Sequence, residues 1–232
     1  MNADDQKRAA AEEAVKLVED GMTLGLGTGS TAAHFIDLIG QKVASGMDIR
    51  AIPTSQISGD QARSLGIELI EPDETTRIDL AVDGADEVDP RLALIKGGGG
   101  ALLREKIIAE AANKFVVIAD GSKKVAALGA FPLPVEIDTF SWALTVRRLR
   151  ETLAEQGFDN PSLDLRADKP GEPFLSDGGN LIVDCKLHRI ADPAALENAL
   201  RQLPGIVETG LFVGLTHTVL IATENGTETI TS

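Results

Sequence analysis

Four charged side chains in the middle of the chain have the types and spacing that suit proton transfer on a small polar substrate. Asp83 and Asp86 stand in the segment DGADE, directly after the apolar run at 80–82. Lys96 precedes four consecutive glycines, and Glu105 follows them in a segment with helical spacing. A carboxylate can move a proton, and a fixed cation can stabilise an oxyanion that forms as the proton leaves.

Glu105 is the most informative of these residues, because its helical neighbours are apolar. At 100° per residue, the positions three, four and seven residues away are Ala101, Leu102, Ile108, Ala109 and Ala112. A carboxylate on such a face loses hydration, which favours its neutral form and suits a general acid or base. The alternative is that only its alkyl stem packs while the carboxylate reaches water. Glu110, with Lys106 and Lys114 four residues to either side, is expected to be a solvated charge.

A glycine-bearing turn at 25–31 is expected to bind phosphate. It lies between a predicted strand at 22–25 and a predicted helix at 31–39, so backbone N–H groups and a helix N-terminus converge there. Ser30 and Thr31 add hydroxyl groups. The pattern Gly27-x-Gly29-x-x-Ala32 also fits a loose dinucleotide fingerprint, but the next strand, at 49–53, is not followed by the acidic residue that a dinucleotide ribose needs. A monophosphate is therefore favoured, with a ligand-free tight turn as the alternative.

Two other segments have structural alternatives. Asp-Gly is ordinary turn chemistry, and Glu87 and Asp89 are expected to be solvated loop charges. The glycines at 97–100 could form a flexible linker, but close approach of the backbone to a ligand explains them better. Eight of the 23 glycines lie in these three segments.

The elements that position these residues alternate between strand and helix, as in a parallel α/β sheet. Strands are predicted at 49–53, 67–70, 78–82, 92–95 and 115–119, and helices at 56–65 and 101–112. From about residue 131 the order becomes strand, helix, strand, strand, helix, strand, with the last strand at 207–213, which is the split βαβ pattern of a ferredoxin-like α+β unit. We therefore expect a Rossmann-like catalytic domain from residues 1–130 and 208–232, and a smaller α+β domain from residues 131–207.

Composition excludes several classes of protein. The 36 acidic and 22 basic residues give a net charge of −14, which argues against nucleic-acid and anionic-membrane binding. No apolar run is long enough to span a membrane, and the N-terminal segment does not have the order of a signal peptide, so a cytoplasmic location is expected. The single Cys185 fits a reducing compartment and is expected to be a core residue.

The remaining candidates are weaker. His34, His188 and His217 share no spacing typical of metal ligands, and each is expected to be structural or exposed. Lys123 and Lys124 follow the strand at 115–119, so one of them could reach the carboxyl edge of the sheet while the other faces solvent. The pattern does not decide between them.

Six segments together resemble type A ribose-5-phosphate isomerase: GLGTGSTAAHFI, VDGADEVD, IKGGGGALLREKII, FVVIADGSKKV, FPLPVEI and PGIVETGLF. The resemblance covers essentially the whole chain. It implies an NAD-free Rossmann-like domain with a smaller α+β domain, no cofactor and no metal. It also implies interconversion of ribose 5-phosphate and ribulose 5-phosphate in the non-oxidative pentose phosphate pathway, by a homodimer or a tetramer, of which we expect the homodimer.

The same resemblance implies a role for each matching residue. Glu105 matches the general base that moves a proton between C2 and C1, and Asp83 and Asp86 match the acidic pair that assists ring opening and holds the hydroxyls. Lys96 matches the lysine that stabilises the enediolate, and Lys7 loosely matches a basic residue near the phosphate. The implied substrate-binding residues are Thr28, Gly29, Ser30, Thr31, Asp83, Gly84, Ala85, Asp86, Lys96, Gly97, Gly98, Gly99 and Lys123.

Two functions from other classes remain as alternatives. A non-catalytic sugar-phosphate sensor would keep the phosphate turn but would not need Glu105 on an apolar face, nor Asp83 and Asp86. An NAD(P)-dependent oxidoreductase would use the same first turn, but it would need an acidic residue after the second strand.

Overall fold

The structure, a computed structural model, describes residues 1–232, which form two compact units. The first unit comprises Met1–Ala85, Arg104–Lys124 and Gly214–Ser232, and the second comprises Asp86–Leu103 and Val125–Val213. The expected division had placed 86–103, 125–130 and 208–213 in the first domain. Residues 86–103 belong to the second unit because their strands β5 (Glu87–Val88) and β6 (Leu94–Ile95) join β14 (Leu211–Phe212) in a three-stranded antiparallel sheet.

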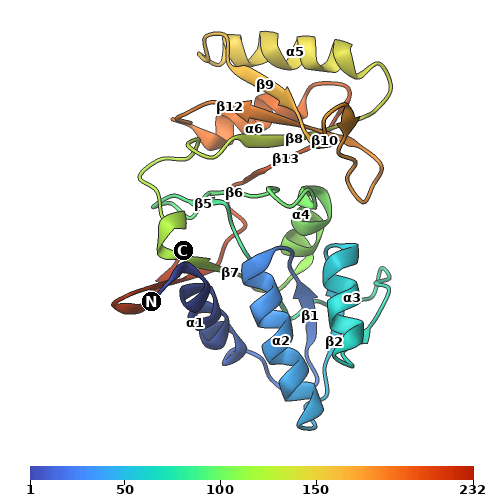
Figure 1. Cartoon of the computed structure of the whole chain (residues 1–232), viewed down its shortest axis with the longest axis vertical. Coiled ribbons are helices and arrows are strands. Elements are labelled where there is room, and N and C mark those ends of the chain that lie inside the picture. Colours follow the sequence, from blue (N-terminus) through green and yellow to red (C-terminus); the bar gives the residue numbers. More distant parts are fainter. The chain divides into compact units, whose positions relative to one another are not determined.

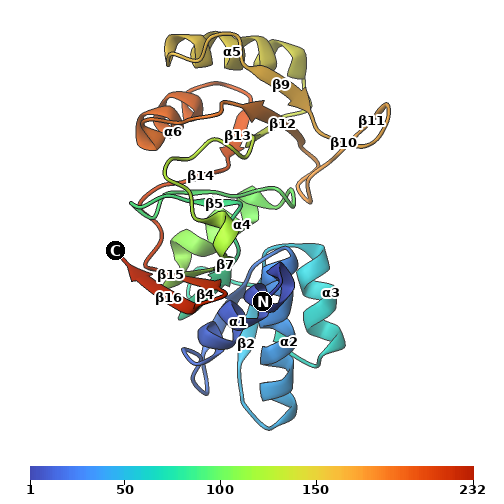
Figure 2. The ribbon, with the colours of Figure 1, turned by 60° about the vertical axis from the view of Figure 1, so that its left-hand side comes forward.

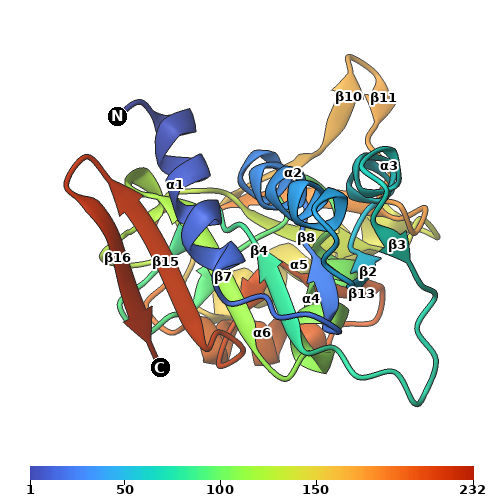
Figure 3. The same ribbon diagram turned by 90° about the horizontal axis from the view of Figure 1, so that it is seen from below.

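The first unit is built on a seven-stranded sheet with the strand order β16-β15-β7-β4-β1-β2-β3 (Figure 3). Every neighbouring pair is parallel except β15 and β16, which form the hairpin that returns the chain to this sheet. The mixed α/β class and the parallel sheet predicted from the sequence are confirmed. The strands are β1 (Thr23–Leu26), β2 (Arg50–Pro53), β3 (Glu68–Leu69), β4 (Leu80–Asp83), β7 (Phe115–Asp120), β15 (Thr218–Thr223) and β16 (Gly226–Thr231).

Helices cover both faces of this sheet. Figure 3 shows α1 (Ala3–Val15), α2 (Ser30–Ala44) and α3 (Gln56–Ser64) together on one face. The helix α4 (Leu102–Ala111) packs against the strands through Ile108 and Ala109, which share a narrow buried space with residues of β1 and β4. The apolar face predicted for this helix is therefore the face that it turns toward the sheet.

The start of α1 is fixed by a reciprocal cap. The Asn2 side chain accepts a hydrogen bond from the Asp5 N–H over 2.9 Å, and the Asp5 carboxylate accepts one from the Asn2 N–H over 3.0 Å. This capping box satisfies N–H groups that the first turn of a helix leaves without partners. It also sets the position of Lys7, which lies two residues further along the helix.

The second unit contains a four-stranded antiparallel sheet with the order β13-β8-β12-β9. The chain order is strand, helix, two strands, helix and strand, so the predicted split βαβ arrangement is confirmed. Helices α5 and α6 share one apolar core with the sheet, including Leu149 and Leu200 against Val135 and Val183. The elements are β8 (Leu133–Ile137), α5 (Trp142–Glu155), β9 (Ser162–Leu165), β12 (Leu181–Lys186), α6 (Pro193–Arg201) and β13 (Ile206–Thr209), labelled in Figure 1.

Two details of this unit matter for the site. A short hairpin of β10 (Ala167–Lys169) and β11 (Glu172–Pro173) extends outward between β9 and β12 (Figure 2). The single strand predicted at 207–213 is wrong: the chain forms two strands, β13 and β14, with Gly210 between them. Gly210 donates its N–H to the Pro134 carbonyl over 2.8 Å and accepts the Lys96 N–H over 2.9 Å, so the backbone changes sheets at this residue.

Candidate active site

The predicted phosphate turn lies at the carboxyl end of β1, in the first unit. Gly29 has a φ of 101° and precedes α2, whose N-terminus receives no hydrogen bond from a capping side chain. Lys7, from α1, donates a hydrogen bond from Nζ to Ser30 Oγ over 2.9 Å. A cation, a hydroxyl and the first N–H groups of a helix are therefore gathered at one turn, a combination that suits an anion.

A second chain segment joins this region after β7. The short helix η1 (Gly121–Lys123) follows that strand, and the Gly121 N–H donates to Gln6 Oε1 over 3.1 Å. The structure distinguishes the two lysines that the sequence could not. Lys124 is exposed and pairs with Glu228 over 2.7 Å, whereas Lys123 is half-buried. Lys123 is therefore the candidate ligand for an anion.

Asp83 is the last residue of β4, at the carboxyl end of the strand where the sequence placed it, and it is buried. Its Oδ1 accepts the N–H of Thr28 over 3.0 Å and the N–H of Gly84 over 2.7 Å. A Cβ added to Gly27 would lie 2.2 Å from Asp83 Cγ, so this carboxylate can occupy its position only because residue 27 has no side chain. The glycine turn and the acidic segment, far apart in the sequence, thus form one structure.

Hydroxyl groups from the end of β2 and the start of α3 support the same turn. Thr28 Oγ1 lies 2.8 Å from Thr54 Oγ1, and Ser58 Oγ donates to the Gly27 carbonyl over 2.6 Å. The sequence motifs do not indicate a role for Thr54 or Ser58. The position of Thr54 in the sequence could have indicated it. Thr54 follows the strand next to β1, and the side chains that follow neighbouring parallel strands meet at the carboxyl edge of the sheet.

Glu105 lies in α4 with 4% of its surface exposed, so the predicted apolar face buries the whole residue. It lines the narrow space under this helix together with Gly27, Thr54 and Asp83. Glu110 is exposed, as expected. A buried carboxylate is therefore placed beside a second carboxylate and next to the phosphate turn, all within the first unit.

The second unit carries Asp86, Lys96 and the glycine run. Asp86 Oδ2 accepts the Gly98 N–H over 2.8 Å. Lys96 is buried, and its ammonium lies 5.5 Å from the centre of the Phe212 ring, a distance typical of a cation–π contact. Gly98 and Gly99 are exposed. The glycine run is thus a turn with defined hydrogen-bond partners, not a flexible linker.

The expectation that Glu87 and Asp89 are solvated loop charges is wrong, since both are buried. Glu87 accepts the N–H groups of Gly129 and Phe131, each over 2.6 Å. Asp89 accepts those of Arg91 and Ala93. These carboxylates accept hydrogen bonds from backbone N–H groups in irregular segments. Local sequence does not reveal this role for Glu87, whose donors lie 42 and 44 residues away.

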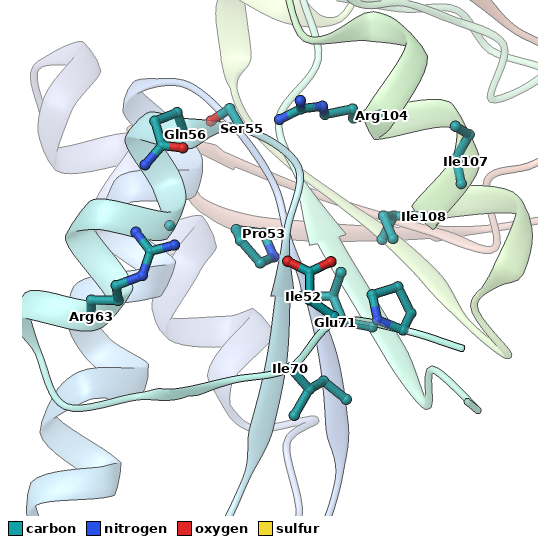
Figure 4. A pocket seen from close by; sticks show the side chains of 12 residues that line it. Ile52, Pro53, Ser55, Gln56, Arg63, Ile70, Glu71, Arg104, Ile107 and Ile108 are labelled. Atoms are coloured by element: carbon teal, nitrogen blue, oxygen red, sulfur yellow. The ribbon is translucent and has the colours of Figure 1, made fainter. Parts of the chain in front are cut away.

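A separate cavity of about 370 Å³ lies between α3, the ends of β2 and β3, and α4 (Figure 4). Arg63 and Arg104 stand on opposite sides of it in Figure 4, with Glu71 between them, Ile70 below and Ile108 on the side of α4. None of the site residues predicted from the sequence lines this cavity. Those predicted residues that belong to the first unit therefore define a different place within it.

The remaining candidates have structural roles. His34 contacts Asp4 over 3.0 Å, and His217 Nδ1 accepts the Phe115 N–H. Cys185 is fully buried in β12, as predicted for a core residue. Residues 1–232 contain no group of three or more His, Cys, Asp or Glu side chains arranged to hold a metal ion. None of the helices combines the length and the apolar character that crossing a lipid bilayer requires.

The chain is similar to known proteins over almost its whole length. The family model of ribose 5-phosphate isomerase A (phosphoriboisomerase A) matches residues 50–226. Ribose-5-phosphate isomerase A of Parvibaculum lavamentivorans is 50% identical over 230 residues, which cover 99% of each chain. That of Rhodopseudomonas palustris strain HaA2 is 51% identical over the same length and coverage.

Solved structures are similar over the whole chain. A D-ribose-5-phosphate isomerase in complex with phospho-erythronic acid is 39% identical, with a TM-score of 0.93 and 100% coverage of both chains. The ribose 5-phosphate isomerase of Plasmodium falciparum is 35% identical, with a TM-score of 0.93 and 99% coverage of both chains. Sequence, family model and fold agree: this chain belongs to the ribose 5-phosphate isomerase A family.

Proposed function

We propose that this protein interconverts D-ribose 5-phosphate and D-ribulose 5-phosphate through an enediolate. The observation that carries the proposal is the buried Glu105 carboxylate, which shares a narrow space with Asp83 beside the phosphate turn. An aldose–ketose isomerase needs a base near the reacting carbons and a hold on the phosphate. Both requirements are met by residues of the first unit.

Glu105 acts as the general base. Its carboxylate takes the proton from C2 of the open-chain aldose, and the electron pair of that C–H bond forms the C1–C2 double bond as the carbonyl electrons move to O1. The protonated Glu105 then returns the proton to C1, while the O2 proton moves to O1 and a carbonyl forms at C2. Nothing is oxidised or reduced overall, so the reaction needs no redox cofactor.

Lys96 stabilises the negative charge that develops on O1 and O2. A fixed cation aimed at developing charge lowers the barrier most effectively where water is excluded, and Lys96 is buried. Asp83 and Asp86, each fixed by a backbone N–H group, assist ring opening and hold the sugar hydroxyls. The backbone of Gly84, Ala85 and the glycines at 97–99 contacts the substrate.

The phosphate binds at the turn formed by Thr28, Gly29, Ser30 and Thr31, with Lys123. Lys7 completes this set, because its ammonium already contacts Ser30. Holding the phosphate fixes the reacting carbons relative to Glu105, which makes the proton transfer effectively intramolecular. The ligand named for the similar structure, phospho-erythronic acid, fits this scheme. It carries a phosphate and a carboxylate, and the carboxylate has the charge of the enediolate and a similar pair of oxygens.

An assay of ribulose 5-phosphate formation from ribose 5-phosphate tests the proposal. We expect turnover by the purified protein alone, with no change when a chelator is added. No turnover, together with tight binding of ribose 5-phosphate by calorimetry, would favour the sugar-phosphate sensor instead. Loss of activity with the chelator would contradict the metal-free mechanism, and tight NAD binding would support the oxidoreductase.

We also propose that the protein is a homodimer in the cytoplasm. Large apolar side chains are exposed around the start of α5, where Phe140 and Leu144 are 84% and 56% exposed. Apolar side chains on an outer surface are typical of subunit contacts. A cytoplasmic location keeps the single Cys185 reduced. Light scattering at micromolar concentration tests the dimer, and a measured monomer mass would reject it.

A further inference from the structure

The glycine turn of the second unit is held by a side chain that the mechanism above does not use. Arg166, which directly follows β9, donates from Nη1 to the carbonyl of Gly97 over 2.8 Å and to that of Gly98 over 3.2 Å. Only 15% of the Arg166 side chain is exposed. Carbonyl oxygens that accept from a guanidinium form charge-assisted hydrogen bonds, which are stronger than those between neutral groups.

Arg166 is itself fixed in direction. Its Nε donates to Asp184 Oδ2 over 2.9 Å, and its Nη2 donates to Asp184 Oδ1 over 2.5 Å, so the pair is bidentate. The guanidinium carbon also lies 5.8 Å from the centre of the Phe174 ring. Two parallel hydrogen bonds and a stacked ring restrict the guanidinium plane, which leaves Nη1 aimed at the glycine turn.

The Gly97–Gly98 peptide group is consequently bound at both ends. Its carbonyl oxygen belongs to Gly97 and accepts from Arg166, and its N–H belongs to Gly98 and donates to Asp86 Oδ2 over 2.8 Å. The two groups point in opposite directions because the peptide is trans. Rotation of this plane would turn a carbonyl oxygen toward the Asp86 carboxylate, and glycines on both sides offer little resistance to such rotation.

The far end of the turn is restrained by the same cluster. Gly100 has a φ of 81°, and a Cβ added there would lie 2.4 Å from Cζ of Phe174, the ring that stacks on Arg166. The Gly100 N–H closes the turn by donating to the Gly97 carbonyl over 3.0 Å. Arg166, Phe174 and Asp184, which we call the turn clamp, therefore restrain both the first and the last glycine.

We propose that Arg166 is a positioning residue for the isomerase reaction. By fixing the Gly97–Gly98 peptide, it keeps the Gly98 N–H on Asp86 and so holds that carboxylate in the direction needed for the sugar hydroxyls. Asp184 acts indirectly, because its carboxylate fixes the orientation of the Arg166 guanidinium. This inference rests on the proposed function, because it assigns the turn clamp to the same reaction.

The test compares Arg166→Met, Arg166→Lys and Asp184→Asn with a matched control, Lys186→Met. Lys186 pairs with Asp164 over 2.8 Å between the same two strands, but on an exposed surface away from the glycine turn. We expect kcat/KM to fall about 10- to 100-fold in Arg166→Met, as for loss of charge-assisted hydrogen bonds. Arg166→Lys should not restore activity, since one ammonium cannot serve both Asp184 and two carbonyls. Lys186→Met should stay within about twofold of the unchanged protein.

A double-mutant cycle separates positioning from general stability. In an Asp86→Ala background, adding Arg166→Met should reduce kcat/KM by less than about threefold, because the effect of Arg166 passes through Asp86. Equal losses in both backgrounds would overturn the proposal, as would near-normal kcat/KM of Arg166→Met in the unchanged background. If Arg166→Met does not fold, the same comparison of kcat/KM with and without Asp86→Ala is made with Arg166→Lys and Asp184→Asn.

Amide hydrogen exchange provides a readout that does not depend on activity. The amides of the glycine turn should exchange faster in Arg166→Met than in Lys186→Met, and exchange that is equal in the two variants would reject the turn clamp. If the unchanged protein shows no isomerase activity, the proposed function fails, while this exchange comparison still tests the clamp itself. The two failures are therefore distinguishable.

Discussion

Nζ of Lys7, in the second turn of α1, donates a hydrogen bond to Ser30 Oγ at the start of α2 over 2.9 Å. The two residues come from different helices that lie on the same face of the seven-stranded sheet (Figure 3). Their contact places an ammonium group beside the N-terminus of α2. Because the chain has a net charge of −14, binding of a phosphate depends on such local positive groups.

Replacing Lys7 with methionine should therefore weaken binding of the substrate phosphate more than it slows the chemical step. Loss of a hydrogen bond to a charged group costs about 1.5–3 kcal/mol, so KM should rise roughly 10- to 100-fold while kcat changes little. Steady-state kinetics with ribose 5-phosphate measure both values. Lys16→Met is the control, since Lys16 is exposed just after the end of α1 and its ion pair is with Glu13 of that helix. A fall in kcat at constant KM would place Lys7 in the chemistry instead.

Glu105→Gln should keep the fold and lose the base. The side chains have nearly the same shape, but an amide cannot accept the C2 proton, so kcat should fall by about 10² to 10⁴. Exchange of the C2 proton with solvent, followed by NMR, should slow by the same factor. Glu110→Gln, on the exposed side of the same helix, is the matched control and should turn over normally. Near-normal kcat of Glu105→Gln would show that another group is the base.

Gly27→Ala should displace the Asp83 carboxylate, because the added Cβ would lie 2.2 Å from Asp83 Cγ. Misplacement of a site group by about 1 Å can cost about 100-fold in rate, and we expect a loss in kcat/KM of that order. Gly46→Ala is the control: nothing lies within 4 Å of its Cβ, although its φ of 100° makes the substitution strained. Both variants should unfold at lower temperature, but only Gly27→Ala should lose activity. Equal kinetics in the two variants would exclude the steric coupling.

Burial raises the pKa of the Cys185 thiol in the folded protein. The folded state therefore holds this proton more tightly than the unfolded state. The contribution of Cys185 to the free energy of unfolding is fully present below the pKa of the unfolded thiol, about 8.5. Above that pH, the free energy of unfolding should fall with a slope approaching about 1.4 kcal/mol per pH unit. Urea unfolding between pH 8 and 10 measures the slope, and the chain has no tyrosine to obscure it. In Cys185→Ala this contribution should vanish; a slope unchanged by the substitution would refute the prediction.

Residue types and periodicity predicted the parallel sheet, the split βαβ unit and the apolar helix face on which Glu105 lies. These features depend on residues that are close in the sequence, since the end of a strand or the apolar face of a helix is defined by residues within one or two turns or a few positions. Thr54 and Ser58 were not predicted, because their partners in the glycine turn lie about thirty residues away. The burial of Glu87 was missed for the same reason, as its N–H donors are Gly129 and Phe131. Contacts of that kind are set by topology, which no local pattern contains.

The role of Arg166 could not be predicted from local sequence either. Its own surroundings in the sequence are polar and irregular, and nothing near it marks a functional residue. Its importance comes from Asp184 on the neighbouring strand and from glycines almost seventy residues earlier. Local sequence could therefore indicate the glycine turn, but not the side chain that holds it.

The division of the chain between its two units also determines when each can fold during synthesis. The second unit ends at Val213, whereas the sheet of the first unit needs β15 and β16, which lie in Gly214–Ser232. β15 pairs with β7 in the middle of the chain, so the sheet that carries Asp83 stays incomplete until β15 and β16 have left the ribosome. The unit that begins later in the chain is the first to be fully translated. A purified chain truncated after Val213 should therefore protect the second unit from protease while the first remains sensitive.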